Sequence, residues 1–533
     1  MHLSDHDLRQ MDEDWIKRLA PDKLRYALQH ALNDLRQARD RLKTTPHNSS
    51  RPPGSMAPWD RSSAITAQDV DVSDDPPDPP DPPAAADTAT PEAKEPSGAG
   101  DKPDTSSRKQ AVRRPCGKQP GAPGHGRIQV LPVDDHCAHR PIICSGCDAP
   151  LLDATPMQAW CGWDQVDIAP LPEGQAGLRL CCNRHTLFEA RCPCGHCTRA
   201  MPYRAPDDGL WEHIEVNQWR LVGPHLAAMI VVLALRMRLS RVRIREFLGE
   251  FLGLSLATGT IDQTIREAGR ASAPLEDELV ADIEQAALLY VDETPWQESA
   301  TLLWLWTLVC ATSVLFVVGQ RSRDMLVNIL GNKFVGVLMS DGYTVYRHWQ
   351  NRLRCWAHLK RKMVGLSEST DARVARVGEG MRMQFAILMA AIYAARLEPP
   401  PDGLAEALAT PMATLKAMCL QHRDDTHEKL HALAVEMLLD WDVIMRQVKE
   451  PLLPLTNNDA ERSLRHWVIL RRISHGTRSA GGTRAFALLA SVIETCRLRK
   501  ISPWRYLARV IDAARSGFSL PSLPEFTPAG DGV

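Results

Sequence analysis

The sequence predicts a multidomain α/β protein with a β-sheet in its C-terminal half, and three observations lead to this prediction. After residue 286, short apolar and β-branched runs alternate with helical segments. Ten of the fourteen cysteines fall between Cys116 and Cys197, which indicates a separate small module. Residues 46–107 are rich in Pro, Asp, Ala and Ser and divide the chain. At 533 residues and 44% hydrophobic content, the chain can form several domains with sizeable cores.

The N-terminal segment, residues 1–45, contains an apolar repeat of three and four residues. Its members are Leu24, Leu28, Ala31, Leu35, Ala38 and Leu42. This spacing forms the seam of a short coiled coil. Three heptads are marginal alone, so an amphipathic helix packed on its own domain is the alternative interpretation.

Charge divides the next two segments. Residues 69–104 hold eleven acids and two lysines, so the rest of the chain is net positive although its formal total is −2. Because so little apolar surface is available there, we predict a disordered linker over residues 46–107. A basic Gly/Pro-rich arm, residues 108–133, follows and includes Arg113, Arg114 and Lys118. The run from Arg462 to Ile493 also holds six arginines and no acid. Such clustering favours contact with phosphates, although a solvated basic surface is the usual alternative.

The cysteine-rich module covers residues 134–205 and contains two C-x2-C knuckles. The first provides Cys144 and Cys147, and the second provides Cys194 and Cys197. No signal peptide opens the chain, so we expect a reducing cytosol and metal ligation in place of disulfides. Four thiolates suit a structural zinc ion. Other side chains compete for the same role, namely Cys137, Cys181, Cys182, Cys192, His139 and His196.

Residues 206–280 are predicted to be helical. A basic helix start near residue 241, a break at Gly253 and a second helix after residue 258 suggest a helix-turn-helix-like DNA-binding domain. A plain helical connector is the alternative interpretation.

Residues 286–510 are predicted to form an RNase H-like domain in the order βββαβαβα. The expected strands are residues 287–291, 302–308, 314–318, 335–340 and 353–358, with a helix at 323–330. A helical insertion is expected at about residues 365–450, and a tail at 511–533. The uncharged residues 302–319 approach membrane-spanning length, but their β-branched and aromatic content favours two buried strands in a protein without a membrane partner.

In an RNase H-like sheet the first and fourth strands are neighbours, so Asp292 and Asp341 would meet at one edge. Two buried carboxylates are costly unless a cation holds them. Glu461, on a late helix, is the expected third carboxylate of a two-metal site for phosphoryl transfer. Hard oxygen ligands choose Mg²⁺ or Mn²⁺. Alternatively, Asn458 caps this helix and Glu461 completes a capping box.

Several blocks of the sequence resemble the insertion-sequence-66 family of transposases, in order and over nearly the whole chain. These blocks are residues 48–53, 117–121 with 124–125, the cysteine-rich module, 292–294, 341–343, 355–361, 457–465 and the end of the chain from 481. The most specific are Cys-Trp-Ala-His at 355–358 and Asn-Asn-x-x-Glu-Arg at 457–462. Lys360 stands where that family usually has Arg.

The resemblance implies a DDE transposase with Asp292, Asp341 and Glu461 as metal ligands. Such an enzyme cleaves the ends of its element and joins the freed 3′-OH to target DNA. His358, Arg462 and Arg465 would contact or orient the scissile phosphate, and Lys360 and Arg361 add basic charge beside them.

The implied partners are double-stranded inverted-repeat ends, target DNA and a second protomer, with accessory proteins left open. The implied location is the cytoplasm, at the nucleoid. A non-catalytic DNA-binding regulator derived from a transposase, and a nuclease that cuts without joining, are the two alternative hypotheses.

Overall fold

The computed structural model describes residues 18, 20–42, 48, 129, 131–152, 155–169, 177–207, 209, 211, 214–331, 334–398 and 403–525. The chain divides into two compact units, one of residues 1–60 with 131–533 and one of residues 61–130. All elements below belong to the first unit. Almost all of the predicted linker, and Arg113, Arg114 and Lys118 of the predicted basic arm, lie outside the described residues.

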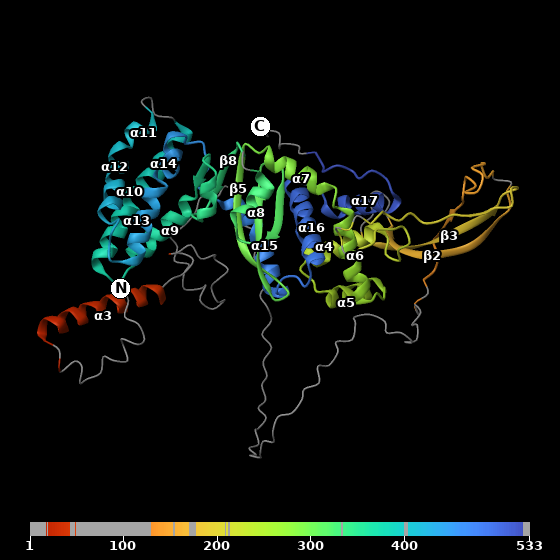
Figure 1. Ribbon diagram of the computed structural model, residues 1–533, viewed down its shortest axis with the longest axis horizontal. Helices are drawn as coiled ribbons and strands as arrows, with labels where there is room; N and C mark the ends of the chain where they lie inside the picture. The colour runs from red at the N-terminus through yellow and green to blue at the C-terminus, as the bar shows by residue number, and fades with distance from the viewer. Residues whose placement is uncertain are drawn as a thin grey trace, which may run out of the picture. The chain divides into compact units, whose positions relative to one another are not determined.

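A five-stranded mixed sheet forms the centre of the C-terminal half (Figure 1). Its strands, in the spatial order β7-β6-β5-β8-β9, are β5 (Leu288–Glu298), β6 (Thr301–Val309), β7 (Val314–Gly319), β8 (Val337–Ser340) and β9 (Arg352–Arg354). β5, β6 and β7 pair antiparallel, whereas β5–β8 and β8–β9 pair parallel. The first and fourth strands are therefore neighbours, as the sequence predicted.

Two strand ends differ most from the prediction. β5 does not stop before Asp292 but continues to Glu298, because β6 pairs with it along its whole second half. The fifth strand stops at Arg354, and the predicted strand over residues 355–358 is wrong. The helix α9 (Trp356–Ser367) begins there, since Trp356, Leu359 and Met363 bury one helical face.

The remaining connections around this sheet are helical. The helix α8 (Arg323–Leu330) follows β7 as predicted, but a 3₁₀ helix, η3 (Thr344–His348), stands between β8 and β9 in place of an α-helix. The uncharged residues 302–319 form most of β6, the turn after it and β7, and these strands are largely buried except at the start of β6. None of the described helices has the length and apolar character needed to span a bilayer.

Helices on both sides of this region in the sequence share one hydrophobic core with the sheet. They are α4 (Pro224–Leu235), α5 (Arg241–Leu252), α6 (Thr258–Ala271), α7 (Leu275–Glu284), α15 (Asn458–Ser474), α16 (Ala480–Leu498) and α17 (Pro503–Ser516). α17 continues past the predicted boundary at residue 510. This shared core joins the predicted helical segment to the sheet domain.

The predicted helix-turn-helix corresponds to α5 and α6, which are joined through Gly253 at a φ of 61°. α6 is largely buried and packs tightly on α16. A Cβ at Gly269 would lie 2.5 Å from the Cβ of Ala485, so only a glycine allows this approach. The exposed cations of this pair of helices, Arg243 and Arg245, lie on α5, the first helix.

The helical insertion has a hydrophobic core of its own, which includes Trp356, Phe385 and Met437. Besides α9 it contains α10 (Ala372–Leu397), α11 (Leu404–Ala407), α12 (Ala409–Gln421), α13 (Glu428–Leu439) and α14 (Trp441–Lys449). These helices cover residues 356–449, and the insertion was predicted at about residues 365–450.

The predicted N-terminal helix is α3 (Pro21–Leu42), and its C-terminal end contacts the insertion. Asp40 is buried there and accepts hydrogen bonds from Ser369 and from the backbone amide of Thr370. Leu24, Leu28 and Leu35 of the heptad seam are exposed. A single chain therefore leaves much of this seam uncovered.

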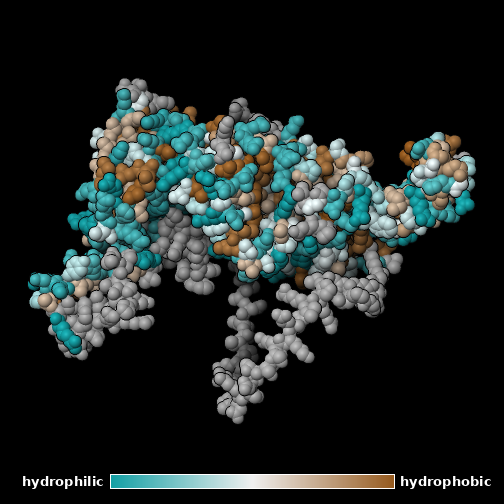
Figure 2. Space-filling view, in the orientation of Figure 1, coloured by the Kyte–Doolittle hydropathy of each residue, from teal (hydrophilic) through white to brown (hydrophobic). Residues whose placement is uncertain are grey.

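The cysteine-rich module is a second sheet, built on a long antiparallel hairpin. Its strands are β1 (Asp135–His139), β2 (Met157–Ala169), β3 (Arg179–Arg191) and β4 (Cys197–Arg199). The end of the module that carries the first knuckle exposes Ile142, Ile143 and Leu152, and apolar surface gathers over this end in Figure 2.

Candidate active site

Two of the predicted carboxylates come from neighbouring strands. β8 pairs with β5 only as far as Tyr290, so the edge of β5 on that side is open at Asp292. Asp341 directly follows β8, and its side chain accepts a hydrogen bond of 2.8 Å from the backbone amide of Tyr343. Burial raises the pKa of Asp292 well above its usual range, and the negative charges of Asp341, Glu293 and Glu461 raise it further. Asp341 and Glu461 therefore both lie close enough to Asp292 to repel its carboxylate.

The third carboxylate, Glu461, lies in the first turn of α15. Its Oε1 is 3.7 Å from Nδ1 of His358, and its Oε2 is 3.6 Å from a guanidinium nitrogen of Arg361. Glu461 Oε1 and His358 Nδ1 are both buried without a hydrogen-bond partner. Burial also lowers the pKa of His358, so its imidazole is neutral at pH 7.

Asn457 connects the elements that carry these acids. It is fully buried, and its side-chain amide donates a hydrogen bond of 2.9 Å to the carbonyl of Val291, the residue before Asp292. Its backbone amide donates to the sulfur of Cys355 over 3.3 Å. The proposed capping box with Asn458 as the cap is wrong. α15 begins at Asn458, and the N-cap residue Asn457 makes no side-chain capping bond because its amide is used by β5.

Two further bonds fix α15 along the sheet. The hydroxyls of Ser463 and Thr307 are 2.9 Å apart, and Arg471 donates to the hydroxyl of Thr294 over 2.8 Å. With Asn457, these bonds set both the position and the rotation of α15, and so the place of Glu461 opposite Asp292.

Replacing Asn457 by Ala should lower the free energy of unfolding by about 1–3 kcal/mol, because the carbonyl of Val291 would lose its partner inside the core. The exposed neighbour Asn458 gives a matched control, and Asn458→Ala should change stability by less than about 0.5 kcal/mol. Chemical denaturation of both variants measures the difference. Equal stabilities would show that the bond to Val291 contributes nothing.

Two acids near the site have other partners. The carboxylate of Glu293 accepts a hydrogen bond of 2.7 Å from Arg321 and another from the hydroxyl of Tyr346. Asp459 is exposed and interacts with Tyr290, whose pKa burial and this charge raise to about 12. Neither acid takes the place of Glu461 beside His358.

The predicted basic residues of α9 and α15 differ in their exposure to solvent. Lys360, Arg462 and Arg465 are exposed, Lys360 on α9 and the two arginines on α15. The side chain of Arg361 is half-buried and faces Glu461. Lys360, Arg462 and Arg465 therefore remain the candidates for contact with a solvent-borne anion.

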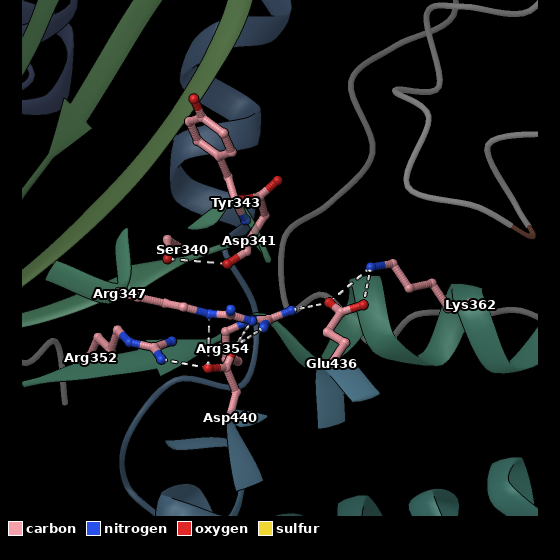
Figure 3. A network of polar contacts seen from close by, with 9 residues as sticks. All are labelled: Ser340, Asp341, Tyr343, Arg347, Arg352, Arg354, Lys362, Glu436 and Asp440. Atoms are coloured by element: carbon pink, nitrogen blue, oxygen red, sulfur yellow. Dashed lines mark hydrogen bonds and ion pairs between the residues drawn. The ribbon is translucent and has the colours of Figure 1, made fainter. Parts of the chain in front are cut away.

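A buried ion-pair network lies beneath Asp341 and was not found from the sequence (Figure 3). Arg352 and Arg354 both donate to Asp440, and Arg354 also donates to Glu436. Lys362 donates to Glu436 over 2.6 Å. These bonds join β9 and α9 to helices of the insertion more than seventy residues away, a separation that no local pattern reveals.

The same network explains the glycine after Asp341. A Cβ at Gly342 would lie 2.6 Å from Arg354 Nη2 and 2.6 Å from Glu436 Oε1. A larger residue would displace this ion pair or the loop that carries Asp341.

The cysteine-rich module contains a group of four thiols whose sulfurs lie within 4.8 Å of one another: Cys144, Cys147, Cys192 and Cys194. Three belong to the predicted zinc set. The fourth thiol of the group is that of Cys192, whereas the sequence predicted Cys197. Cys197 is exposed on β4 and pairs with Arg191 of β3. The second knuckle is thus a C-x-C turn, in which the amide of Gly195 donates to the carbonyl of Cys192. The backbone amide of Gly146 lowers the pKa of Cys144 to about 6, which favours its thiolate.

Comparison with known proteins identifies a family for this chain. A model of the family described as "Transposase IS66 family" matches residues 220–485, which include the sheet, the insertion and Glu461. The uncharacterized protein y4jO of Sinorhizobium fredii is 29% identical over 171 residues, which is 32% of this chain and 51% of that protein. The uncharacterized protein y4jD of the same organism is 25% identical over 329 residues, which is 55% of this chain and 62% of that protein. The chain thus spans little more than half the length of these relatives. It belongs to the IS66 transposase family.

Proposed function

We propose that this protein is a DNA transposase that cleaves the ends of an insertion sequence and joins them to target DNA by metal-dependent phosphoryl transfer. The observation that carries the proposal is the approach of Asp292, Asp341 and Glu461, from two strands and a helix, at an open sheet edge. The strand order of the sheet supports an RNase H-like core. Membership of a transposase family supports DNA as the substrate.

The side chains fit a divalent metal. The raised pKa of Asp292 reflects its burial and then the like charges around it, and Glu461 Oε1 lacks a hydrogen-bond partner. A cation would relieve both, and carboxylate oxygens suit Mg²⁺ or Mn²⁺. Asp292, Asp341 and Glu461 would hold the ions, which activate an attacking oxygen and stabilise a leaving oxygen in this class of reaction.

Other residues of the chain would position the DNA. Lys360, Arg462 and Arg465 are exposed on α9 and α15, the helices that carry His358 and Glu461. Their charges suit a phosphodiester backbone. His358, uncharged and buried beside Glu461, would orient the scissile phosphate without adding a proton. Arg361, directed at Glu461, would hold that carboxylate in place.

Pairing of two protomers is part of the proposal because two ends must be processed together. The exposed seam of α3, with Leu24, Leu28 and Leu35, would bury its apolar side chains against a second copy of itself. The basic arm, the cysteine-rich module and the helical segment would hold the terminal repeats.

The test is cleavage of linear DNA that carries the element's terminal repeats. With Mg²⁺ or Mn²⁺, the full chain should release a 3′-OH at each end, and EDTA should stop the reaction. A product that is cut but never joined would favour the nuclease alternative. End binding without cleavage in either metal would favour the regulator alternative.

We also propose that Cys144, Cys147, Cys192 and Cys194 bind one structural zinc ion. The purified full chain should contain about one zinc per molecule that resists dialysis. Cys192→Ser should release it, whereas the matched variant Cys197→Ser should retain it. Zinc content measured by mass spectrometry decides between the two ligand sets. Loss of zinc in Cys197→Ser but not in Cys192→Ser would support the set predicted from the sequence.

A further inference from the structure

Beside the proposed catalytic acids lies a second cluster of potential metal ligands. Cys355, His358 and Glu461 place a sulfur, an imidazole nitrogen and a carboxylate oxygen within 4.8 Å of one another. Cys355 connects β9 to α9, His358 lies in the first turn of α9, and Glu461 comes from α15. Cys355 is fully buried and His358 is 9% exposed, so solvent does not satisfy the first two groups.

Two atoms of this cluster lack partners and face each other. His358 Nδ1 and Glu461 Oε1 are 3.7 Å apart, buried and without a hydrogen bond. An unpaired buried nitrogen and an unpaired buried carboxylate oxygen are each costly, and a cation between them removes both costs. The cluster therefore combines ligand types that suit a metal ion with two buried polar atoms that have no hydrogen-bond partner.

The ligand types distinguish this cluster from the three-carboxylate site. Mg²⁺ is a hard ion that takes oxygen ligands and avoids thiols. A thiolate, an imidazole and a carboxylate together are typical of Zn²⁺, which binds four ligands in a tetrahedron. The sulfur is held in place because it accepts a hydrogen bond from the backbone amide of Asn457 over 3.3 Å.

We propose that Cys355, His358 and Glu461 form a binding site for one ion of the zinc class, with solvent as the fourth ligand. Binding would release the thiol proton of Cys355 to solvent. Glu461 is shared with the proposed catalytic site, so a zinc ion here would withdraw that carboxylate from Mg²⁺ and inhibit the enzyme. The binding site stands on the cluster itself, and the inhibition rests on the proposed function.

Co²⁺ is the probe for binding because its bond to a thiolate gives a charge-transfer absorption. The full chain, with zinc already in the cysteine-rich module, is titrated with Co²⁺ and then with competing Zn²⁺. Wild type should bind one further equivalent with this absorption. Cys355→Ser should lose this absorption and bind Co²⁺ at least about tenfold more weakly. Serine is chosen because its oxygen can still accept the hydrogen bond from the backbone amide of Asn457. Cys419→Ser, at another buried cysteine, should match wild type.

The result that overturns the site is an unchanged charge-transfer absorption and stoichiometry in Cys355→Ser, with both variants folded by thermal denaturation. His358→Ala gives a second, independent test, since it should also weaken binding at least about tenfold. Unchanged Co²⁺ affinity in His358→Ala would exclude the imidazole and contradict the three-ligand site.

Inhibition is tested on DNA cleavage, each variant relative to its own rate without zinc. Zn²⁺ should inhibit the Mg²⁺ reaction of wild type, and Cys355→Ser should need at least about tenfold more Zn²⁺. Equal inhibition of both would overturn the competition. Absence of cleavage in wild type, together with Cys355-dependent Co²⁺ absorption, would instead contradict the proposed function and support the metal site.

Discussion

Asp292→Asn is expected to abolish DNA cleavage and at the same time to stabilise the metal-free protein. Cleavage should fall by about 10³-fold or more, since a bound metal ion contributes several kcal/mol to such a reaction. Stability should rise because the buried carboxylate repels Asp341, Glu293 and Glu461 when no cation is present. A neutral amide of the same shape removes this repulsion.

Single-turnover cleavage and thermal denaturation in EDTA measure the two effects. Asp324→Asn is the matched control, because Asp324 is exposed in the first turn of α8 and should change neither quantity. Retained cleavage in Asp292→Asn would remove Asp292 from the site. A loss of stability in Asp292→Asn would show that positive or hydrogen-bonding groups of the protein already stabilise the charge of Asp292.

The same charge gives the stability of the metal-free protein a pH dependence. The pKa of Asp292 is higher in the folded than in the unfolded chain, so ionisation opposes folding. This unfavourable contribution is full above the folded pKa and disappears as the pH falls to the ordinary aspartate range. The gain in stability from Asp292→Asn should therefore be largest at neutral or higher pH and shrink on acidification. Denaturation of both proteins across this pH range tests the sign.

Asp440→Asn should have the largest effect on folding, with a loss of about 3–5 kcal/mol in the free energy of unfolding. Asp440 is 2% exposed and accepts from Arg352 and Arg354, which are also buried. Burial acts to raise its pKa, but these guanidiniums lower it, so the carboxylate stays ionised. Removing its charge leaves buried cations with too little compensation.

Chemical denaturation measures this loss, and Asp442→Asn is the control because Asp442 is exposed in the first turn of α14, the helix that follows Asp440. Cleavage by Asp440→Asn should also fall, since Arg354 lies so close to the loop of Asp341 that a Cβ at Gly342 would be 2.6 Å from its Nη2. Equal stability of the two variants would show that the ion-pair network beneath Asp341 (Figure 3) contributes little.

The strand pattern of the sequence predicted the sheet well because the strands after residue 286 are apolar and short. The prediction failed at the ends of strands, because the pairing partner of a strand determines where that strand ends. β5 continues past Asp292 because β6 pairs with it, and residues 356–358 join a helix because Trp356 packs into the core of the insertion. The sequence of a single strand or helix reveals neither the pairing nor the packing.

The three proposed acids were predicted from their positions after strands and on a late helix, but the residues that hold them in place were not predicted. Asn457 belongs to the Asn-Asn-x-x-Glu-Arg block, but nothing in that block indicates that its amide bonds to the carbonyl of Val291, 166 residues away. The choice of Cys192 over Cys197 depends on a turn at Gly195 that spacing alone does not reveal. Long-range hydrogen bonds of this kind depend on the tertiary fold.

The most direct test of the central claim is a strand-transfer assay with DNA ends of the element, target plasmid and Mg²⁺, in which wild type is compared with Glu461→Gln. Wild type should join both ends to the plasmid. Glu461→Gln should bind the ends with similar affinity but form neither cleaved nor joined product. Joined product from Glu461→Gln, or none from wild type in Mg²⁺ or Mn²⁺, would contradict a three-carboxylate transposase site.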